Sequence, residues 1–426
     1  MKKPPKFSVA LETLKKLVSL DFPKLIEHPE CNAILSHWLL TPSVRPPQLP
    51  AKLYKEQDRI FGPLAAKFRH TSSNEVGEYQ QGLNFEFTDV PFPPPAQREF
   101  TFIDLFAGIG GFRIAMQKNG GLCVFSSEWN KYAQQTYNRN FGDTPYGDIR
   151  NIKEAEIPDH DVLCAGFPCQ PFSLAGVSKK NSMGRKHGFE DETQGTLFFE
   201  IARILANKRP KAFFLENVKN LFRHDKGQTF EVIRKTLEDE LGYVVNWKIV
   251  DGAKWVPQHR ERLFIVGYDP KQIKITKEEI VIPEKPEADY KYPELSGVIQ
   301  EKVGTEYTLG PGTWSTLERH KAHHAEAGNG FGYGLHTLPI KKGEVTRTIS
   351  ARYHKDGAEI LVEQKGKLPR RLTVEEAMQL QGYDPKRFEF PVSGTQAYRQ
   401  IGNSVVVPAI TATASRIATI LKERSK

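Results

Sequence analysis

A cysteine between two prolines has the most distinctive chemical setting in this 426-residue chain. The apolar run 162–165 predicts a buried strand that breaks at Gly166 and leads to Cys169. Pro168 and Pro171 restrict the backbone on both sides, so the sulfur is held in one direction. An α/β enzyme places a nucleophile on such a stiff loop beyond a strand end. The alternative is a small buried thiol in a tight turn.

A glycine loop follows the first strand expected in the region of strand–helix alternation. Gly108, Gly110 and Gly111 would let the backbone approach a ligand closely at a helix N-terminus. The dinucleotide pattern would place a further glycine at position 113, where Arg113 stands instead. The loop therefore favours an adenosine-type ligand without a pyrophosphate over NAD, and a simple tight turn is the alternative.

Polar and aromatic residues near the glycine loop and beyond the second expected strand suit an adenosine ligand. Glu128 is placed to accept hydrogen bonds from both ribose hydroxyls. Phe106 and Trp129 could enclose an adenine ring, with ordinary packing as the alternative for Trp129. Asp148, followed by Ile149, could accept a hydrogen bond from the adenine amino group. These residues form the predicted cofactor pocket.

Charged residues at two later strand ends complete the predicted active site. Glu216 ends the strand expected at 212–215, and parallel strands end at one edge of a sheet, so Glu216 and Cys169 should be neighbours. Enclosure raises the pKa of a carboxyl group and makes it a proton donor. Arg260 and Arg262 are two apart in an extended segment and should point to one side, where they could hold a phosphate or a base carbonyl. The alternatives are a turn-capping glutamate and a solvated charge run.

Composition restricts the class of protein. The chain has 39% hydrophobic and 26% charged residues, and its net charge of +9 favours a polyanionic partner. Its cysteines have no paired metal-ligand spacing and no disulfide framework, which predicts a metal-free protein of a reducing cytoplasm. No signal-peptide pattern and no bilayer-length apolar run are present, so we expect no membrane association.

The elements that position these residues suggest a division of the chain. We expect a helical extension at 1–90, a proline-rich linker at 91–99, a catalytic and cofactor-binding domain at 100–269, a small irregular domain at 270–368, and a return to the catalytic domain at 369–426. Apolar strands alternating with helices predict an α/β fold with a mostly parallel sheet covered on both faces. The expected strands are 101–106, 122–126, 161–165, 212–215, 244–250 and 263–266, and the main expected helices are 7–22, 31–40, 112–119, 195–208, 229–241, 374–381 and 408–422.

Five motifs in order resemble the motif series of the DNA cytosine-5 methyltransferases, closest to bacterial enzymes of the Dcm type. They are Phe-Ala-Gly-Ile-Gly-Gly at 106–111, Gly-Phe-Pro-Cys-Gln-Pro-Phe-Ser at 166–173, Glu-Asn-Val at 216–218, Gln-x-Arg-x-Arg at 258–262 and Gln-Ile-Gly-Asn-Ser-Val-Val-Val-Pro at 400–408. The resemblance covers residues 100 to about 415. It implies a Rossmann-like methyltransferase sheet, S-adenosyl-L-methionine as cofactor, double-stranded DNA as partner and a target-recognition domain within 270–368.

The resemblance also implies a role for each motif residue. Cys169 is the nucleophile that adds to C6 of cytosine, and Glu216 stabilises N3. Arg262 lies near the base carbonyl, and Arg260 supports the site. The cofactor-binding residues are Phe106, Gly108, Gly110, Gly111, Glu128, Trp129, Asp148 and Ile149, with Asn403 and Ser404 completing the pocket.

Two basic stretches are expected to contact DNA. The first is the glycine-containing loop 174–193, which could close on the substrate. The second lies within 270–368 and resembles the recognition region of enzymes that modify sites beginning CC, such as CCWGG or CCGG. The expected contacts are Ser173, Lys179, Lys180, Arg185, Arg347, Arg352, Tyr353 and Lys355, and the alternative for any of them is a purely structural role.

Two other functions remain open at this point. A tRNA cytosine-5 methyltransferase could use the same scaffold, although the long insert at 270–368 argues against it. A DNA-binding regulator could act through the helices of residues 1–90. For the main hypothesis we expect a monomer in the bacterial cytoplasm, associated with the nucleoid, either solitary or accompanied by a restriction endonuclease that acts on the same site without being bound.

Overall fold

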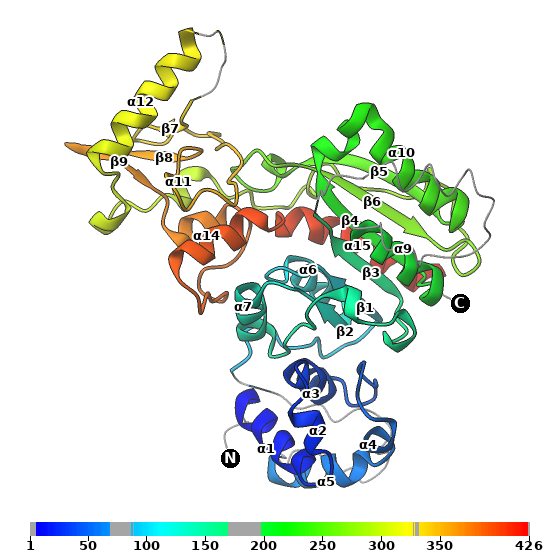
Figure 1. The fold of residues 1–426 in the computed structure, drawn as a ribbon. Helices are drawn as coiled ribbons and strands as arrows, with labels where there is room; N and C mark the ends of the chain where they lie inside the picture. Colours follow the sequence, from blue (N-terminus) through cyan, green and yellow to red (C-terminus); the bar gives the residue numbers. More distant parts are fainter. Residues whose placement is uncertain are drawn as a thin grey trace. The chain divides into compact units, whose positions relative to one another are not determined.

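The computed structural model describes residues 6–68, 87, 89–168, 197–326, 328 and 332–424 (Figure 1). The chain divides into two compact units. The first comprises Met1–Lys248, Leu263–Ile282 and Ala414–Lys426, and the second comprises Ile249–Arg262 and Pro283–Thr413. Most of a six-stranded sheet belongs to the first unit, and a three-stranded sheet belongs to the second.

The six-stranded sheet has the strand order β2-β1-β3-β4-β6-β5. Its strands are β1 (Phe100–Leu105), β2 (Gly121–Ser127), β3 (Val162–Gly166), β4 (Ala212–Val218), β5 (Val244–Asp251) and β6 (Glu261–Tyr268). β1 pairs in parallel with β2 and β3, and β3 pairs in parallel with β4. All of β2 is buried, and β1, β3 and β4 are buried at all but one position each, as in sheets covered on both faces. The mostly parallel α/β sheet expected from the sequence is confirmed.

Helices alternate with these strands. They are α6 (Gly111–Lys118), α7 (Lys131–Phe141), α9 (Leu197–Lys208) and α10 (Gln228–Lys235), which continues as a π-helical turn over Thr236–Glu240. α9 buries Phe198, Ile201 and Leu205, which recur at helical spacing. Short 3-10 helices cover Ile149–Asn151, Glu154–Glu156, Lys219–Phe222, His224–Gly227, Gly252–Lys254 and Thr305–Tyr307.

The N-terminal helices belong to the same compact unit as the large sheet. They are α1 (Phe7–Ser19), α2 (Pro23–Ile26), α3 (Cys31–Leu40), α4 (Ala51–Lys55) and α5 (Gln57–Phe68), drawn in blue in Figure 1. α3 is buried at every position except Asn32. Trp38 packs edge-on against Phe61 of α5 with ring centroids 4.8 Å apart. A helix buried all round needs packing partners on more than one side.

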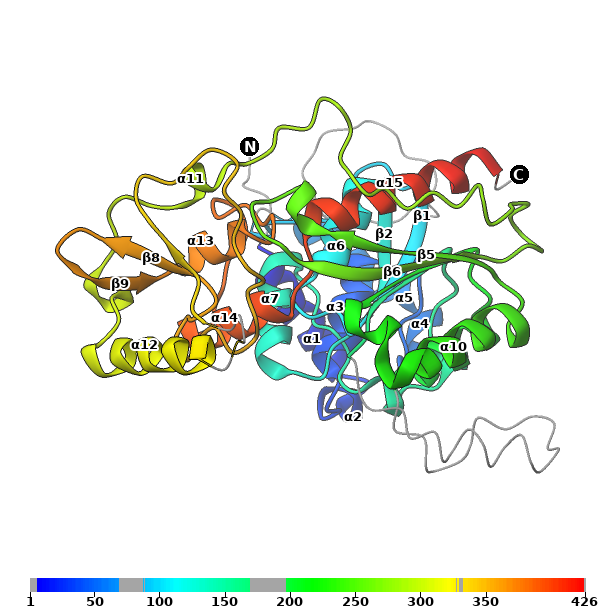
Figure 2. The same cartoon turned by 90° about the horizontal axis from the view of Figure 1, so that it is seen from above.

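The second unit contains a small sheet of order β7-β8-β9. Its elements are β7 (Leu335–His336), β8 (Leu361–Gln364), β9 (Lys367–Arg371), α11 (Leu295–Val298), α12 (Pro311–Glu326), α13 (Val374–Gln379) and α14 (Gly394–Asn403). α12 contacts β9 and has no buried residue (Figure 2). Irregular structure is expected over much of this region, and α12 is a long helix that the sequence analysis did not predict.

The last helix, α15 (Val407–Arg424), contributes residues to both units. Among the described residues, no single helix is long and apolar enough to cross a membrane. α14 and α15 meet that test only together, as a pair bent by 43°.

Candidate active site

The glycine loop makes a tight turn between β1 and α6. Phe106, Gly108 and Gly110 have positive φ angles of 54°, 55° and 85°. Gly110 N donates to Ala107 O at 2.8 Å and closes the turn. A Cβ on Gly110 would lie 2.2 Å from Cε2 of Phe141, so the close packing of the loop on α7 requires glycine there. Among the other predicted pocket residues, Phe106 is half-buried, and Gly111 and Ile149 are buried.

Glu128 follows β2, and its carboxylate connects the glycine loop to the start of α7. Its Oε2 accepts from Gly108 N at 2.8 Å, and its Oε1 accepts from Asn130 N at 2.8 Å. Burial raises the pKa of Glu128, and these backbone hydrogen bonds act in the opposite direction. Each carboxylate oxygen has further acceptor capacity, which suits the hydroxyls of a nucleoside. Trp129 beside it is 76% exposed, so its ring is open to stacking.

Asp148 ends a segment that returns alongside β2. Tyr146 N donates to Ser126 O at 2.9 Å, and Glu128 N donates to Tyr146 O at 2.8 Å. These bonds bring the backbone that leads to Asp148 to the strand end that bears Glu128. Asp148 accepts from Arg150 N at 3.1 Å, and its ion pair with the Arg150 side chain lowers its pKa. The carboxylate is therefore an ionised acceptor at the same edge of the sheet.

β3 and β4 end side by side, at the place where the sequence predicts that the nucleophile and its acidic partner meet. Gly166 pairs with Glu216 in the parallel register, and a Cβ on Gly166 would lie 3.4 Å from Oε2 of Glu216. Glu216 is 8% exposed. The buried Asn217 donates from Nδ2 to Phe167 O at 2.8 Å. The chain is thus anchored two residues before Cys169, which lies outside the described residues.

Arg260 is held in the second unit by three backbone carbonyls. Its Nη1 donates to Ile349 O at 3.0 Å, and its Nη2 donates to Gly402 O at 2.8 Å and Ser404 O at 2.5 Å. The residue is 2% exposed. Its guanidinium therefore joins two separate stretches of this unit, whereas Arg262 is half-buried. The sequence predicts one shared orientation for these two arginines, and their environments differ.

The turn after α14 contains the last two predicted pocket residues. Asn403 is exposed, and Ser404 is buried. The Ser404 hydroxyl lies 2.6 Å from the hydroxyl of Tyr383. Asn403 is thus open to solvent, while Ser404 contributes to the packing of the turn.

The expected DNA-contacting residues of the second unit fall into two groups. Arg347, Arg352 and Lys355 are exposed. Tyr353 is fully buried, and its hydroxyl donates to Ile360 O at 2.6 Å and accepts from Leu372 N at 2.8 Å. Its position in the core differs from the expected DNA contact, because a polar neighbourhood in the sequence does not reveal which side chain faces inward. Ser173, Lys179, Lys180 and Arg185 lie outside the described residues.

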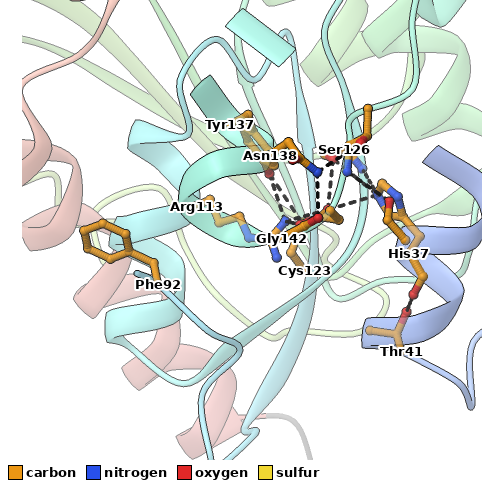
Figure 3. A network of polar contacts seen from close by, with 12 residues as sticks. His37, Thr41, Phe92, Arg113, Cys123, Ser126, Tyr137, Asn138 and Gly142 are labelled. Atoms are coloured by element: carbon orange, nitrogen blue, oxygen red, sulfur yellow. Dashed lines mark hydrogen bonds and ion pairs between the residues drawn. The ribbon is translucent and has the colours of Figure 1, made fainter. Parts of the chain in front are cut away.

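A buried polar network around Arg113 of α6 was not predicted from the sequence (Figure 3). Arg113 Nη1 donates to Asp143 Oδ2 at 2.7 Å and to the Tyr137 hydroxyl at 3.1 Å. The side chains of Arg113 and Asp143 are each 2% exposed. Nε2 of His37, a residue of α3, lies 3.3 Å from Oδ2 of Asp143. The arginine in place of the third glycine of a dinucleotide motif is therefore a buried ion-pair partner. The one sign of this ion pair in the sequence is a charged residue between the apolar Phe112 and Ile114.

Known proteins resemble this chain in sequence and in fold. A family model described as C-5 cytosine-specific DNA methylase matches residues 100–419. The Type II methyltransferase M.SsoII of Shigella sonnei is 48% identical over 339 residues, which cover 79% of this chain and 85% of that protein. A DNA-cytosine methyltransferase of Escherichia coli K12 is 45% identical over 391 residues, covering 79% and 81% of the two chains. The crystal structure of the S. pombe Dnmt2 methyltransferase shares the fold, with a TM-score of 0.57 at 16% identity over 76% of this chain and 99% of that one.

Proposed function

We propose roles for the individual site residues of this chain, which belongs to the C-5 cytosine-specific DNA methylase family and is a DNA cytosine-5 methyltransferase. Cys169 is the nucleophile. Its thiolate forms a bond to C6 of cytosine, which moves electron density to C5. Once C5 has been methylated, the C5 proton passes to a water molecule, the C5–C6 double bond re-forms and the S–C6 bond breaks, which regenerates the thiolate. The base must first be flipped out of the duplex, at a cost of roughly a few kcal/mol.

The pairing of Gly166 with Glu216 is the observation that best supports this assignment. It brings the chain that leads to Cys169 to the strand end that presents the Glu216 carboxyl group. In our proposal this group hydrogen-bonds N3 of the cytosine and stabilises the ring as it gains electron density. Asn217 Nδ2 donates a hydrogen bond to Phe167 O at 2.8 Å, which limits the movement of the chain just before Cys169.

The enzyme uses S-adenosyl-L-methionine, which supplies an electrophilic methyl group when bound. The described residues fit this cofactor. The turn between β1 and α6 has three residues with positive φ. The buried carboxylate of Glu128 accepts from Gly108 N, and the exposed Trp129 follows it. Glu128 would bind the ribose hydroxyls and Asp148 the adenine amino group. The full set that we propose for cofactor binding is Phe106, Gly108, Gly110, Gly111, Glu128, Trp129, Asp148, Ile149, Asn403 and Ser404.

The two arginines have different proposed roles. Arg262 would contact the carbonyl of the flipped base. Arg260 would act as a positioning residue, since its guanidinium already bonds to three backbone carbonyls. It would hold the turn that contains Asn403.

We place DNA recognition within residues 270–368. Arg347, Arg352 and Lys355 are exposed there and would contact base edges or phosphates. Ser173, Lys179, Lys180 and Arg185 would contact DNA from the loop that follows Cys169. The proposed target is a short site beginning CC, either CCWGG or CCGG. We further propose a monomer of the bacterial nucleoid, with any cognate restriction endonuclease acting on the same site without being bound.

Bisulfite sequencing tests the proposed nucleophile and target together. The enzyme and the variant Cys169→Ser are incubated with S-adenosyl-methionine and unmethylated genomic DNA, and modified cytosines are mapped. We expect C5 methylation at one short sequence with the wild-type enzyme and none with the variant. Methylation by Cys169→Ser at wild-type levels would disprove the role of Cys169, and modification at sites not beginning CC would disprove the proposed target.

A further inference from the structure

We propose that the N-terminal helices complete the cofactor site by positioning the segment between Glu128 and Asp148. The residues responsible are Glu30, Ser36, His37 and Pro47, which we call the buttress. All four lie outside residues 100–419, which the family model matches. This inference rests on the cofactor roles proposed for Glu128 and Asp148.

The backbone donors of residues 144–147 show how the buttress acts. Thr144 N donates to Ser36 Oγ at 2.9 Å, and Gly147 N donates to Glu30 Oε1 at 3.2 Å. Residue 145 is a proline without an N–H, and the remaining donor, on residue 146, bonds to β2. Two of the three backbone donors in the segment are therefore satisfied by side chains of the N-terminal helical region. An unpaired backbone donor is costly when buried, so these side chains help to determine the path of the segment.

Tyr146 extends this contact into the core. Its side chain is fully buried, and its hydroxyl donates to Pro47 O at 2.9 Å. Its ring stacks on Phe125 of β2 with centroids 5.1 Å apart and lies 5.3 Å from the His37 ring. The backbone of the same residue bonds to Ser126 O and accepts from Glu128 N. Tyr146 therefore contacts the buttress through its side chain and the end of β2 through its backbone.

His37 connects the buttress directly to β2. Its Nδ1 lies 2.9 Å from Ala33 O, which can only accept, so Nδ1 bears the proton of this contact. Its Nε2 accepts from Ser126 N at 3.2 Å. Burial lowers the pKa of His37, which agrees with the neutral imidazole that this pair of bonds requires. The ring thus acts as a fixed donor and acceptor between α3 and the strand that ends before Glu128.

His37 also lies next to the ion pair between Asp143 and Arg113 of α6, the helix that follows the glycine loop (Figure 3). The Ser126 hydroxyl lies 3.2 Å from His37 Nε2 and 3.5 Å from Asp143 Oδ2. Asp143 in turn pairs with Arg113 of α6 at 2.6 Å. Asp143 therefore links His37 of α3 to α6, which follows the glycine loop, while Ser36, Glu30 and His37 bond to the segments that lead to Asp148 and Glu128. A shift of α3 would alter the spacing of these elements, and cofactor affinity depends on that spacing.

The test uses full-length variants of Glu30, because this side chain reaches Gly147 next to Asp148. Glu30→Ala removes the acceptor, whereas Glu30→Gln keeps an oxygen that can accept from Gly147 N. Glu27→Ala is the matched control, since Glu27 is exposed on the neighbouring α2 cap and its loss changes the net charge equally. Ser36→Ala is a second, smaller change, which removes the hydroxyl that accepts from Thr144 N. Circular dichroism establishes that each variant is folded.

Two measurements other than turnover report the positioning. Hydrogen exchange in the cofactor-free protein should be faster at residues 144–147 in Glu30→Ala than in Glu27→Ala. Calorimetric titration with S-adenosyl-homocysteine should show a Kd raised about 5- to 10-fold in Glu30→Ala, the size of the net effect of one ordinary lost hydrogen bond. Glu30→Gln should restore most of the affinity, and the KM for DNA should stay unchanged in all variants. Ser36→Ala should follow Glu30→Ala with a smaller effect.

An unchanged Kd in both Glu30→Ala and Ser36→Ala would overturn the inference. Asp148→Ala separates this failure from failure of the proposed cofactor site. If Asp148→Ala weakens binding and Glu30→Ala does not, the buttress has no positioning role, and the assignment of Asp148 stands. If neither variant weakens binding although exchange becomes faster, the assignment of Asp148 and the inference both fail. If Glu30→Ala and Asp148→Ala each weaken binding, and the double variant loses less affinity than the sum of the two effects, Glu30 acts through Asp148 as proposed.

Discussion

At position 260, one guanidinium satisfies carbonyls from two separate stretches of the second unit. We expect Arg260→Ala to lower the free energy of unfolding by about 2–4 kcal/mol, because buried carbonyls lose their donor. Denaturant unfolding measures this change. Arg352→Ala is the control, since Arg352 is exposed and its loss should change stability by less than about 0.5 kcal/mol. Equal stability of the two variants would contradict the positioning role of Arg260.

Single residues also show where inference from sequence stops. Gly166 and Glu216 could be placed at neighbouring strand ends, because parallel strands end at one edge and the apolar runs before them were clear. Tyr353 and Arg260 could not be recognised as buried, since each stands in a polar stretch, and only the folded chain shows that they bond to Ile360, Leu372 and the three carbonyls. The residue type indicates the chemistry that a side chain could perform. Tertiary contacts decide whether that side chain is free to contact a substrate or is buried in the core.

At the scale of elements, the turn from β1 to α6 offers a matched pair of glycines. Gly108 and Gly110 both have positive φ, but a Cβ on Gly108 meets nothing within 4 Å, whereas one on Gly110 would lie 2.2 Å from the Phe141 ring. We expect Gly108→Ala to cost about 1 kcal/mol of stability, from backbone strain alone. Gly110→Ala should cost at least about 3 kcal/mol, because overpacking adds to that strain. Thermal unfolding of both variants checks the order, and equal losses would show that Phe141 moves aside freely.

The elements that were predicted and missed differ in burial. α3 was expected at 31–40 and occurs as Cys31–Leu40, because its apolar residues lie in an almost continuous buried run. α12 was not predicted, because none of its residues is buried and its sequence has no apolar stripe to reveal a helical period. The short strands β7, β8 and β9 were missed for a related reason. Two to five residues are too few to show alternation, and their pairing is long-range.

At the scale of the whole molecule, the sequence predicts a helical extension at 1–90, and the structure groups Met1–Lys248 into one compact unit with most of the large sheet. Composition and periodicity could show that residues 7–40 form helices. They could not show that Glu30, Ser36 and His37 bond to residues about 90–120 positions away, because hydrogen-bond partners distant in sequence leave no local pattern.

Stability should depend on pH through histidines buried in this unit. His160 is 8% exposed, and burial lowers its pKa to about 4, while burial also lowers the pKa of His37. A histidine with a depressed pKa in the folded state takes up its proton first in the unfolded chain. Its contribution to stability is therefore complete above about pH 6.5 and is lost as the pH falls from there toward the folded-state pKa.

The variant His160→Gln isolates this effect. Asp104 and Glu128 have pKa values raised by burial, so their contributions change with pH in the opposite direction, but they titrate alike in both proteins. The difference in unfolding free energy between wild type and His160→Gln should therefore shift by about 2 kcal/mol against the wild type between pH 7 and pH 5, at about 1.4 kcal/mol per unit below pH 6.5. Denaturant unfolding at the two pH values measures it. A constant difference would mean that His160 binds its proton equally well in the folded and unfolded chains, and that burial does not keep the imidazole neutral.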